Sequence, residues 1–190
     1  MKLLLASNSP RRKELLAGLG YQFDIIKIEV DESYPSDLSV AEIAEYISNK
    51  KADAHQSTDD EIILTADTIV ALENNILLKP KDSSEAYEMI KNLSNKTHQV
   101  YTAFTIKTNG KKVSKTSKTD VTFSEITDKE INYYIENFKP FDKAGSYGIQ
   151  EWIGMGKISS INGSFYSVMG LPCNLVYEEL IKLSHLPDNL

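Results

Sequence analysis

The stretch LLLASNSPRRKELLAGLG, residues 3–20, joins an apolar run to a helix-like pattern through a few small polar residues. The run at residues 3–6 predicts a short buried strand. The leucines that follow recur at helical spacing and stop before Gly20, which predicts a helix and its C-terminal end. Ser9 is the natural N-cap of this helix, and Pro10 is its first residue. A strand therefore turns directly into a helix near the start of the chain.

The first turn of this helix carries the adjacent cations Arg11, Arg12 and Lys13. Unpaired backbone N–H groups already make that end of a helix positive, so cations there are repelled by the helix dipole. An anion would complete the arrangement, because a capping serine, free amides and arginines suit phosphate oxygens. Alternatively the side chains extend into solvent, since such a turn costs only about 0.3–1 kcal/mol per charge. The stretch by itself leaves both interpretations open.

Length and composition indicate one domain over residues 1–190, since a chain of this size buries one substantial core and no flexible hinge interrupts it. The lone Cys173 cannot form an internal disulfide. The N-terminal apolar run is too short for a signal peptide or a membrane span, so we expect a cytoplasmic protein. The net charge of −6 disfavours a broad nucleic-acid-binding surface but permits a local basic pocket for a small polyanion.

Further helices are predicted where a capping residue precedes apolar residues at helical spacing. They are expected to follow Ser39, Asp82 or Ser83, Thr127 and Pro172. The first of them runs to about His55, and Glu130 completes a capping box with Thr127.

Apolar and alternating runs predict the strands, which are YQFDIIKI (21–28), EIILTAD (61–67), TIVALE (68–73), HQVYTAFTIKT (98–108) and KKVSKTSKTDVTFSEI (111–126). The polar pair Asp67 and Thr68 interrupts strand material. Turns at Asn109–Gly110 and at Asn162–Gly163 each predict a hairpin. Strands and helices alternate early and antiparallel strands come late. We therefore predict an α/β fold with a twisted mixed β-sheet flanked by helices.

Two charged residues stand where the pattern is otherwise apolar. Lys51 lies one turn after Ile47 on the apolar stripe of the helix that Ser39 caps. It either points along a cleft wall or carries its ammonium group out to solvent. Asp67 lies between two apolar runs, where burial is costly without a cation, a metal ion or several donors. The alternative for Asp67 is a cap or turn aspartate at a strand end.

Glu32 and Lys79 complete a coherent set with these residues, although each alone could be solvated. Glu32 and Asp67 are two carboxylates able to hold Mg²⁺, and the nearby cations suit phosphates. No Walker A motif, kinase signature or GxGxxG sequence supplies a rival phosphate site. A site for a nucleotide polyphosphate is the simplest common explanation.

The fragments SNSPRR, VDES, NKKA, TADTIV, LKP, THQVYTA, DKAGSYGIQ and NGSFYSVMGLP follow one another along almost the whole chain. In this order and spacing they resemble the Maf proteins, the septum-formation-linked nucleoside triphosphate pyrophosphatases. The resemblance implies a house-cleaning enzyme that cleaves a nucleoside triphosphate to the monophosphate and pyrophosphate. It also implies two lobes around a central cleft, as in inosine triphosphatases, and a homodimer.

The resemblance and the chemistry together assign roles to named residues. The predicted catalytic residues are Glu32, Asp67 and Lys79, and the predicted substrate-binding residues are Ser7, Ser9, Arg11, Arg12, Lys51, Thr68 and Gln150. Glu32 and Asp67 are the expected ligands of Mg²⁺ or Mn²⁺, and Asp67 is also the candidate for orienting or deprotonating the attacking water. Arg12, Lys51 and Lys79 would bind phosphate oxygens, with Ser7 and the amides near Ser9 as further donors.

Three positions bear on the substrate, because Arg11, Thr68 and Gln150 resemble the family members that act on dTTP and UTP rather than on 7-methyl-GTP. A neutral amide and a hydroxyl can meet the donor and acceptor edge of uracil or thymine. Modified uridine and related pyrimidine nucleotides are further candidate substrates. Leucine before Lys79 and threonine before Ala66 depart from the family pattern but leave the ligand positions untouched.

Two other functions stay open at this point: an inosine or xanthosine triphosphatase activity, and a non-hydrolysing nucleotide sensor linked to cell division. A pure sensor would have no need of Glu32, Asp67 and Lys79 as a set. His98 and Cys173 have no partner pattern for catalysis, so both are interpreted as structural residues.

Overall fold

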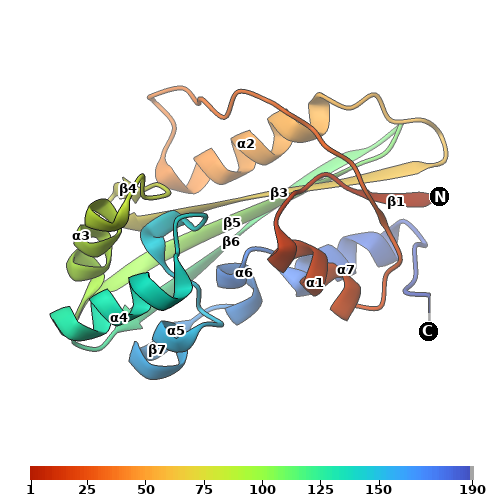
Figure 1. Cartoon of the computed structure of the whole chain (residues 1–190). Coiled ribbons are helices and arrows are strands. Elements are labelled where there is room, and N and C mark those ends of the chain that lie inside the picture. Colours follow the sequence, from red (N-terminus) through yellow and green to blue (C-terminus); the bar gives the residue numbers. More distant parts are fainter. Residues whose placement is uncertain (189–190) are drawn as a thin grey trace. The chain divides into compact units, whose positions relative to one another are not determined.

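The structure is a computed structural model that describes residues 1–188 (Figure 1). Its strands are β1 (Lys2–Leu5), β2 (Asp24–Ile25), β3 (Glu61–Leu72), β4 (Asn75–Leu77), β5 (Thr97–Lys107), β6 (Lys112–Phe123) and β7 (Ile158–Asn162). They form a seven-stranded sheet in the order β2-β1-β3-β5-β6-β7, with β4 paired to β3 outside this path. β1 is parallel to β2 and β3, whereas the β3–β4 and β6–β7 pairs are antiparallel. The predicted mixed sheet is confirmed.

The helices are α1 (Pro10–Gly18), α2 (Val40–Asp53), α3 (Ser83–Leu93), α4 (Asp128–Phe138), α5 (Trp152–Lys157), α6 (Phe165–Met169) and α7 (Cys173–Lys182), with a 3₁₀ turn at Ala144–Ser146. The predicted caps are confirmed. Ser9, Asp82 and Thr127 each accept a hydrogen bond from the backbone N–H three residues on, and Ser39 forms a capping box with Glu42. Within residues 1–188 no helix is both long and apolar enough to cross a bilayer.

The chain divides into two compact units. The first unit contains residues 1–67, 102–117 and the chain from Gly170 onward, and the second contains residues 68–101 and 118–169. Each has buried apolar residues of its own. Leu4, Ala6 and Ile63 form a cluster in the first unit, against which Ile26 and Ile28 pack, and Val70, Val100 and Val121 form one in the second.

The predicted interruption at Asp67 and Thr68 is wrong, because β3 runs without a break through both residues. A β-ladder is made by backbone groups, so a polar side chain does not end it when that side chain has a partner of its own. The residues before Asp67, from Ile62 to Ala66, are buried. Asp67 is therefore neither a cap nor a turn residue, which removes the alternative to a functional or ion-paired aspartate.

The hairpin predicted at Asn162–Gly163 is also wrong. β7 ends at Asn162, and α6 begins at Phe165 after only two residues. Gly163 has a φ of 134°, and an added Cβ there would lie 2.6 Å from Oγ1 of Thr119. Thr119 Oγ1 also accepts a hydrogen bond from the Ser164 N–H at 3.1 Å. This tertiary contact with β6 directs the chain from β7 to the start of α6. This glycine serves close packing and a positive φ rather than a two-residue turn.

Several element boundaries differ from prediction, as at β2 and at the end of α2. The strand expected over residues 21–28 is reduced to Asp24–Ile25, which pairs with β1 at Leu4 and Leu5. The helix expected to reach about His55 ends at Asp53, where Ala54 is the C-cap. The strand is short because only Leu4 and Leu5 of β1 pair with it, which residue patterns do not record. The helix ends within two residues of the predicted position.

His98 is fully buried in the second unit, as its structural interpretation expects. Its Nε2 lies 2.7 Å from the Tyr147 hydroxyl, and its ring stacks on Phe123 with centroids 5.5 Å apart. Burial lowers the pKa of His98 to about 4.

This lowered pKa predicts an acid-sensitive fold. The unfolded histidine takes up a proton near pH 6.5 and the folded one only near pH 4, so the stabilising contribution is complete above pH 6.5 and is lost as the pH falls toward 4. Denaturant unfolding from pH 7 to pH 4 should show that wild type loses roughly 3 kcal/mol more than His98→Phe. Parallel pH profiles of the two proteins would contradict the prediction.

Candidate functional site

The N-terminus of α1 lies at the first predicted anion site. Ser9 caps the helix, and the Ser9 N–H donates to Ser7 Oγ at 3.2 Å, so the hydroxyls of both serines are oriented by backbone groups. Arg12 enters the same cluster, with Nη1 3.5 Å from Ser7 Oγ. Arg11 lies beside it in the first turn and is half-buried. Ser7, Ser9 and Arg12 are therefore brought together as predicted.

The Arg12 guanidinium points into the protein rather than out to solvent. Its Nε donates to the carbonyl of Gly170 at 2.9 Å, and its Nη1 donates to the carbonyl of Ala66 at 2.8 Å. Burial lowers the pKa of Arg12, while the nearby charges of Asp67 and Glu32 act in the opposite direction. A guanidinium with two carbonyl acceptors keeps a fixed orientation and its full charge, which suits binding of a phosphate.

Lys51 lies between the two predicted metal ligands. Its Nζ is 2.7 Å from Glu32 Oε1 and 2.8 Å from Asp67 Oδ1. The side chains of Lys51 and Asp67 are each 13% exposed, whereas that of Glu32 is 54% exposed. Lys51 thus points inward, and two carboxylates share its single positive charge. The ammonium of Lys51 therefore offsets the cost of burying the Asp67 carboxylate, which the sequence pattern predicts to be high.

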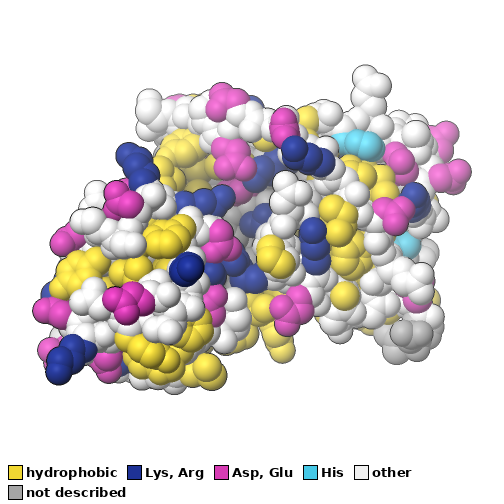
Figure 2. Space-filling view, in the orientation of Figure 1, with side chains coloured by type: hydrophobic (Ala, Val, Ile, Leu, Met, Phe, Trp, Pro, Cys, Tyr) yellow, Lys and Arg dark blue, Asp and Glu magenta, His cyan; other side chains and the backbone are white. Residues whose placement is uncertain are grey.

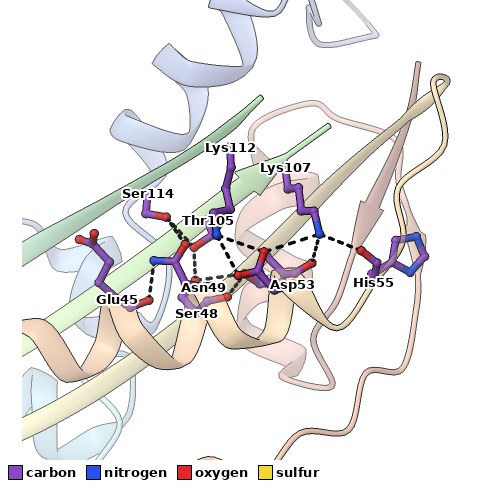
Figure 3. A network of polar contacts seen from close by, with 11 residues as sticks. Glu45, Ser48, Asn49, Asp53, His55, Thr105, Lys107, Lys112 and Ser114 are labelled. Atoms are coloured by element: carbon purple, nitrogen blue, oxygen red, sulfur yellow. Dashed lines mark hydrogen bonds and ion pairs between the residues drawn. The ribbon is translucent and has the colours of Figure 1, made fainter. Parts of the chain in front are cut away.

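Buried and partly buried polar contacts hold α2, the helix that carries Lys51, against strands of the first unit (Figure 3). Ser48 Oγ lies 3.1 Å from Thr65 Oγ1 on β3 and donates to Thr105 Oγ1 on β5 at 3.0 Å. The chain of contacts continues from Thr105 to Ser114 and from Ser114 to Asn49, each at 2.9 Å.

The spacing of these contacts explains why Lys51 meets Asp67. Ser48 and Lys51 are three apart on α2, so they share a helix face, and Thr65 and Asp67 are two apart on β3, so they share a sheet face. The hydroxyl contact of Ser48 with Thr65 therefore packs this face of α2 against this face of β3. The ion pair of Lys51 with Asp67 joins the same two faces one helical turn further on.

The carboxylates around Lys51 suit a divalent cation whose remaining ligands come from the substrate. Glu32 and Asp67 supply two carboxylates, and hard cations prefer such oxygens. Among residues 1–188 no group of three or more His, Cys, Asp and Glu side chains is placed to hold a metal ion. Magnesium usually binds through one or two carboxylates together with substrate phosphates, so a pair of carboxylates fits this use.

The other predicted site residues belong to the second unit. Thr68 is half-buried on β3, directly after Asp67, and Lys79 is exposed in the loop after β4. Gln150 is half-buried, yet its Oε1 is buried and has no hydrogen-bond partner among the described residues. An unpartnered buried amide oxygen is costly, and a ligand with a donor group would satisfy it.

Sequence reasoning missed an ionic cluster beside Gln150. Lys143 is buried, with its Nζ 2.7 Å from Asp142 Oδ1 and 3.1 Å from Glu151 Oε1, and the Tyr134 hydroxyl donates to Glu151 Oε2. The only available signal was the alternation of charged residues with glycine in FDKAGSYGIQEWIGMG. That pattern does not indicate which charges meet, because a glycine-rich segment permits many backbone paths.

Comparisons with known proteins identify the family. The Maf-like protein family matches residues 2–183, and the chain belongs to it. It is 50% identical over 185 residues to the dTTP/UTP pyrophosphatase of Bacteroides thetaiotaomicron, covering 96% of each chain. It is 49% identical over 182 residues to the dTTP/UTP pyrophosphatase of Parabacteroides distasonis, covering 94% of each chain. The Ham1 protein of Staphylococcus aureus has a TM-score of 0.43 at 18% identity, over 67% of this chain and 73% of that one.

Proposed function

We propose that this protein is a nucleoside triphosphate pyrophosphatase that hydrolyses dTTP and UTP to the monophosphate and pyrophosphate. The name of relatives that are 50% and 49% identical over nearly the whole chain supports this substrate choice. The observation that carries the proposal is the position of Lys51 between Glu32 and Asp67, with the Arg12 guanidinium on the carbonyl next to Asp67. The proposed metal ligands and two of the proposed phosphate-binding cations belong to the first unit.

The reaction requires cations and a means of directing water. As the bond from the water oxygen to the α-phosphorus forms, the bond to the departing pyrophosphate breaks, and negative charge builds on that leaving group. Arg12 and Lys51 would neutralise this charge, with Ser7, Ser9 and the amides of α1 as further donors. Asp67 would orient the water and accept its proton. Lys79, in the second unit, is proposed as an additional phosphate-binding cation.

Glu32 and Asp67 are the proposed ligands of Mg²⁺ or Mn²⁺. A bound divalent cation would neutralise phosphate charge and make the attacking water more acidic. Lys51 pairs with both carboxylates, so it would hold the two ligands in place and could itself contribute a positive charge to phosphate binding.

Arg11, Thr68 and Gln150 are the proposed determinants of pyrimidine specificity. The Gln150 Oε1 supports this proposal most directly, because it is a buried acceptor with no hydrogen-bond partner within residues 1–188 and the N3–H of uracil or thymine is a donor. Modified uridine nucleotides share that edge and are proposed as further substrates.

We also propose a single functional domain that works as a homodimer in the cytoplasm and binds no nucleic acid. Acidic side chains are scattered among the lysines and arginines over the face seen in Figure 2, and the net charge of −6 opposes binding to a polyanion along a broad surface.

A panel of nucleoside triphosphates tests the proposal. With Mg²⁺ or Mn²⁺ present, pyrophosphate should be released from dTTP and UTP well before the purine nucleotides, and a chelator should abolish the release because the cation is required. Faster hydrolysis of ITP and XTP would overturn the substrate assignment. Tight nucleotide binding by calorimetry without any metal-dependent turnover would instead favour a sensor.

A further inference from the structure

The turn that carries Gln150, residues 148–151, is held by contacts of the Glu151 carboxylate. Within the second unit, Glu151 Oε1 lies 3.1 Å from Lys143 Nζ, and its Oε2 accepts a hydrogen bond from the Tyr134 hydroxyl. The Glu151 N–H donates to the carbonyl of Gly148 at 3.0 Å, which closes the turn over Ile149 and Gln150. The side chains of Lys143 and Glu151 are only 9% and 17% exposed, so this ion pair is poorly accessible to water.

Tyr134 joins the two ends of this turn. Its hydroxyl accepts a hydrogen bond from the Gly148 N–H at 2.9 Å while it donates to Glu151. Burial and the neighbouring carboxylate of Glu151 raise the pKa of Tyr134 far above its ordinary value, so the hydroxyl keeps its proton. The ring is held in turn by stacking on Phe138, with centroids 5.1 Å apart. Tyr134 is thus a rigid support on α4.

Gly148 shows how closely the turn fits its carboxylate. A Cβ added at Gly148 would lie 2.6 Å from the Glu151 carboxyl carbon and 2.9 Å from both of its oxygens. A side chain at this position would force the Glu151 carboxylate to move. The Glu151 carboxylate is therefore packed directly against the backbone of the turn that carries Gln150.

We propose that Tyr134 and Glu151 are positioning residues that set base specificity by holding Gln150, whose Oε1 is a buried acceptor with no hydrogen-bond partner within residues 1–188. This inference rests on the proposed function and adds residues to its base-binding part. Uracil and thymine offer an N3–H donor to that oxygen, whereas the N3 of cytosine is itself an acceptor and would face it unfavourably. Discrimination between UTP and CTP requires that the amide stays in place, and the Tyr134–Glu151 contact holds the turn that carries it.

Tyr134→Phe is the sharpest test, because it deletes one hydroxyl while keeping the ring that stacks on Phe138. Tyr133→Phe is the matched control, since Tyr133 is the preceding residue of the same helix, is half exposed, and packs its ring against Trp152. Steady-state kinetics with UTP and CTP should show that Tyr134→Phe lowers the UTP-to-CTP ratio of kcat/KM about tenfold, mainly through KM for UTP. The control should keep the wild-type ratio.

Equilibrium binding of UMP and CMP to the same proteins separates this inference from the proposed activity. Wild type should prefer UMP even if it released no pyrophosphate, and Tyr134→Phe should lose that preference. Glu151→Gln, which keeps the side-chain size, should also lose it, and thermal unfolding of each variant shows whether the fold remains. A folded Tyr134→Phe protein with wild-type preference for UMP and UTP would overturn the inference, as would a wild type that does not distinguish the two bases.

Discussion

Asp67→Asn is expected to lower pyrophosphate release from dTTP and UTP by roughly 10²-fold or more while the fold remains intact. Asparagine keeps the side-chain shape and can still accept a hydrogen bond from Lys51, whose Nζ lies 2.8 Å from Asp67 Oδ1. It has no charge to hold a metal ion and cannot take a proton from water. Nucleotide binding should fall much less, because Arg12 and Lys51 remain.

Turnover, thermal unfolding and nucleotide affinity measured on this one variant test the assignment. Asp53→Asn is the matched control, because Asp53 is another aspartate of the first unit paired with lysines, here Lys107 and Lys112, and the proposed mechanism does not use it. The control should keep wild-type turnover. Near-normal pyrophosphate release from a folded Asp67→Asn protein would rule out the catalytic role of Asp67.

Lys51→Met should also reduce turnover by roughly 10²-fold, since it removes a cation that would stabilise the charge developing on the phosphates. It should have a second effect that a lysine acting only on phosphate would not produce. The variant leaves the carboxylates of Glu32 and Asp67 close together without their shared counter-ion, because both lie within 2.8 Å of the same ammonium in the wild type. A divalent cation then becomes the preferred counter-ion.

Thermal unfolding with and without Mg²⁺ detects this second effect in the absence of any nucleotide. Mg²⁺ at about 100 times its Kd should stabilise Lys51→Met by about 2.7 kcal/mol, roughly 5–10 °C for a chain of this size, and wild type by less. Lys50→Met controls for the loss of one positive charge from the same helix, since Lys50 pairs with Asp31 at 3.8 Å. An equal response of Lys51→Met and Lys50→Met to Mg²⁺ would argue against metal binding by this carboxylate pair.

Short-range patterns predicted most of the helices because caps and tight turns are decided by residues close together in the chain. Ser9 and Thr127 cap their helices through an amide three residues on, and the Asn109–Gly110 turn joins β5 to β6 as expected. The hairpin predicted at Asn162–Gly163 was wrong because a residue distant in sequence decides the backbone path there. There the path of the chain depends on Thr119, which lies more than forty residues earlier in sequence.

The candidate site was predicted as a set of residues rather than as a set of contacts. The apolar stripe of α2 correctly placed Lys51 on an inward face, and the cost of burying a carboxylate correctly marked Asp67. Their ion pair joins residues 16 apart, and its length depends on how α2 rotates upon the sheet. The buried apolar face of α2 orients the helix, and the hydroxyl contacts of Ser48 with Thr65 and Thr105 add to it; no local pattern indicates that these hydroxyls meet.

The sequence by itself determined the α/β class, the capped helix starts, the family and the identities of the proposed site residues, because these depend on residue type and spacing. Tertiary structure alone decided that β3 passes unbroken through Asp67, that Arg12 turns inward onto two carbonyls, and that Glu151 meets Lys143 and Tyr134. Each of these depends on which residues the packed fold places beside a polar group. Burial makes an unpaired charge costly, but it does not specify which distant residue will pair with it.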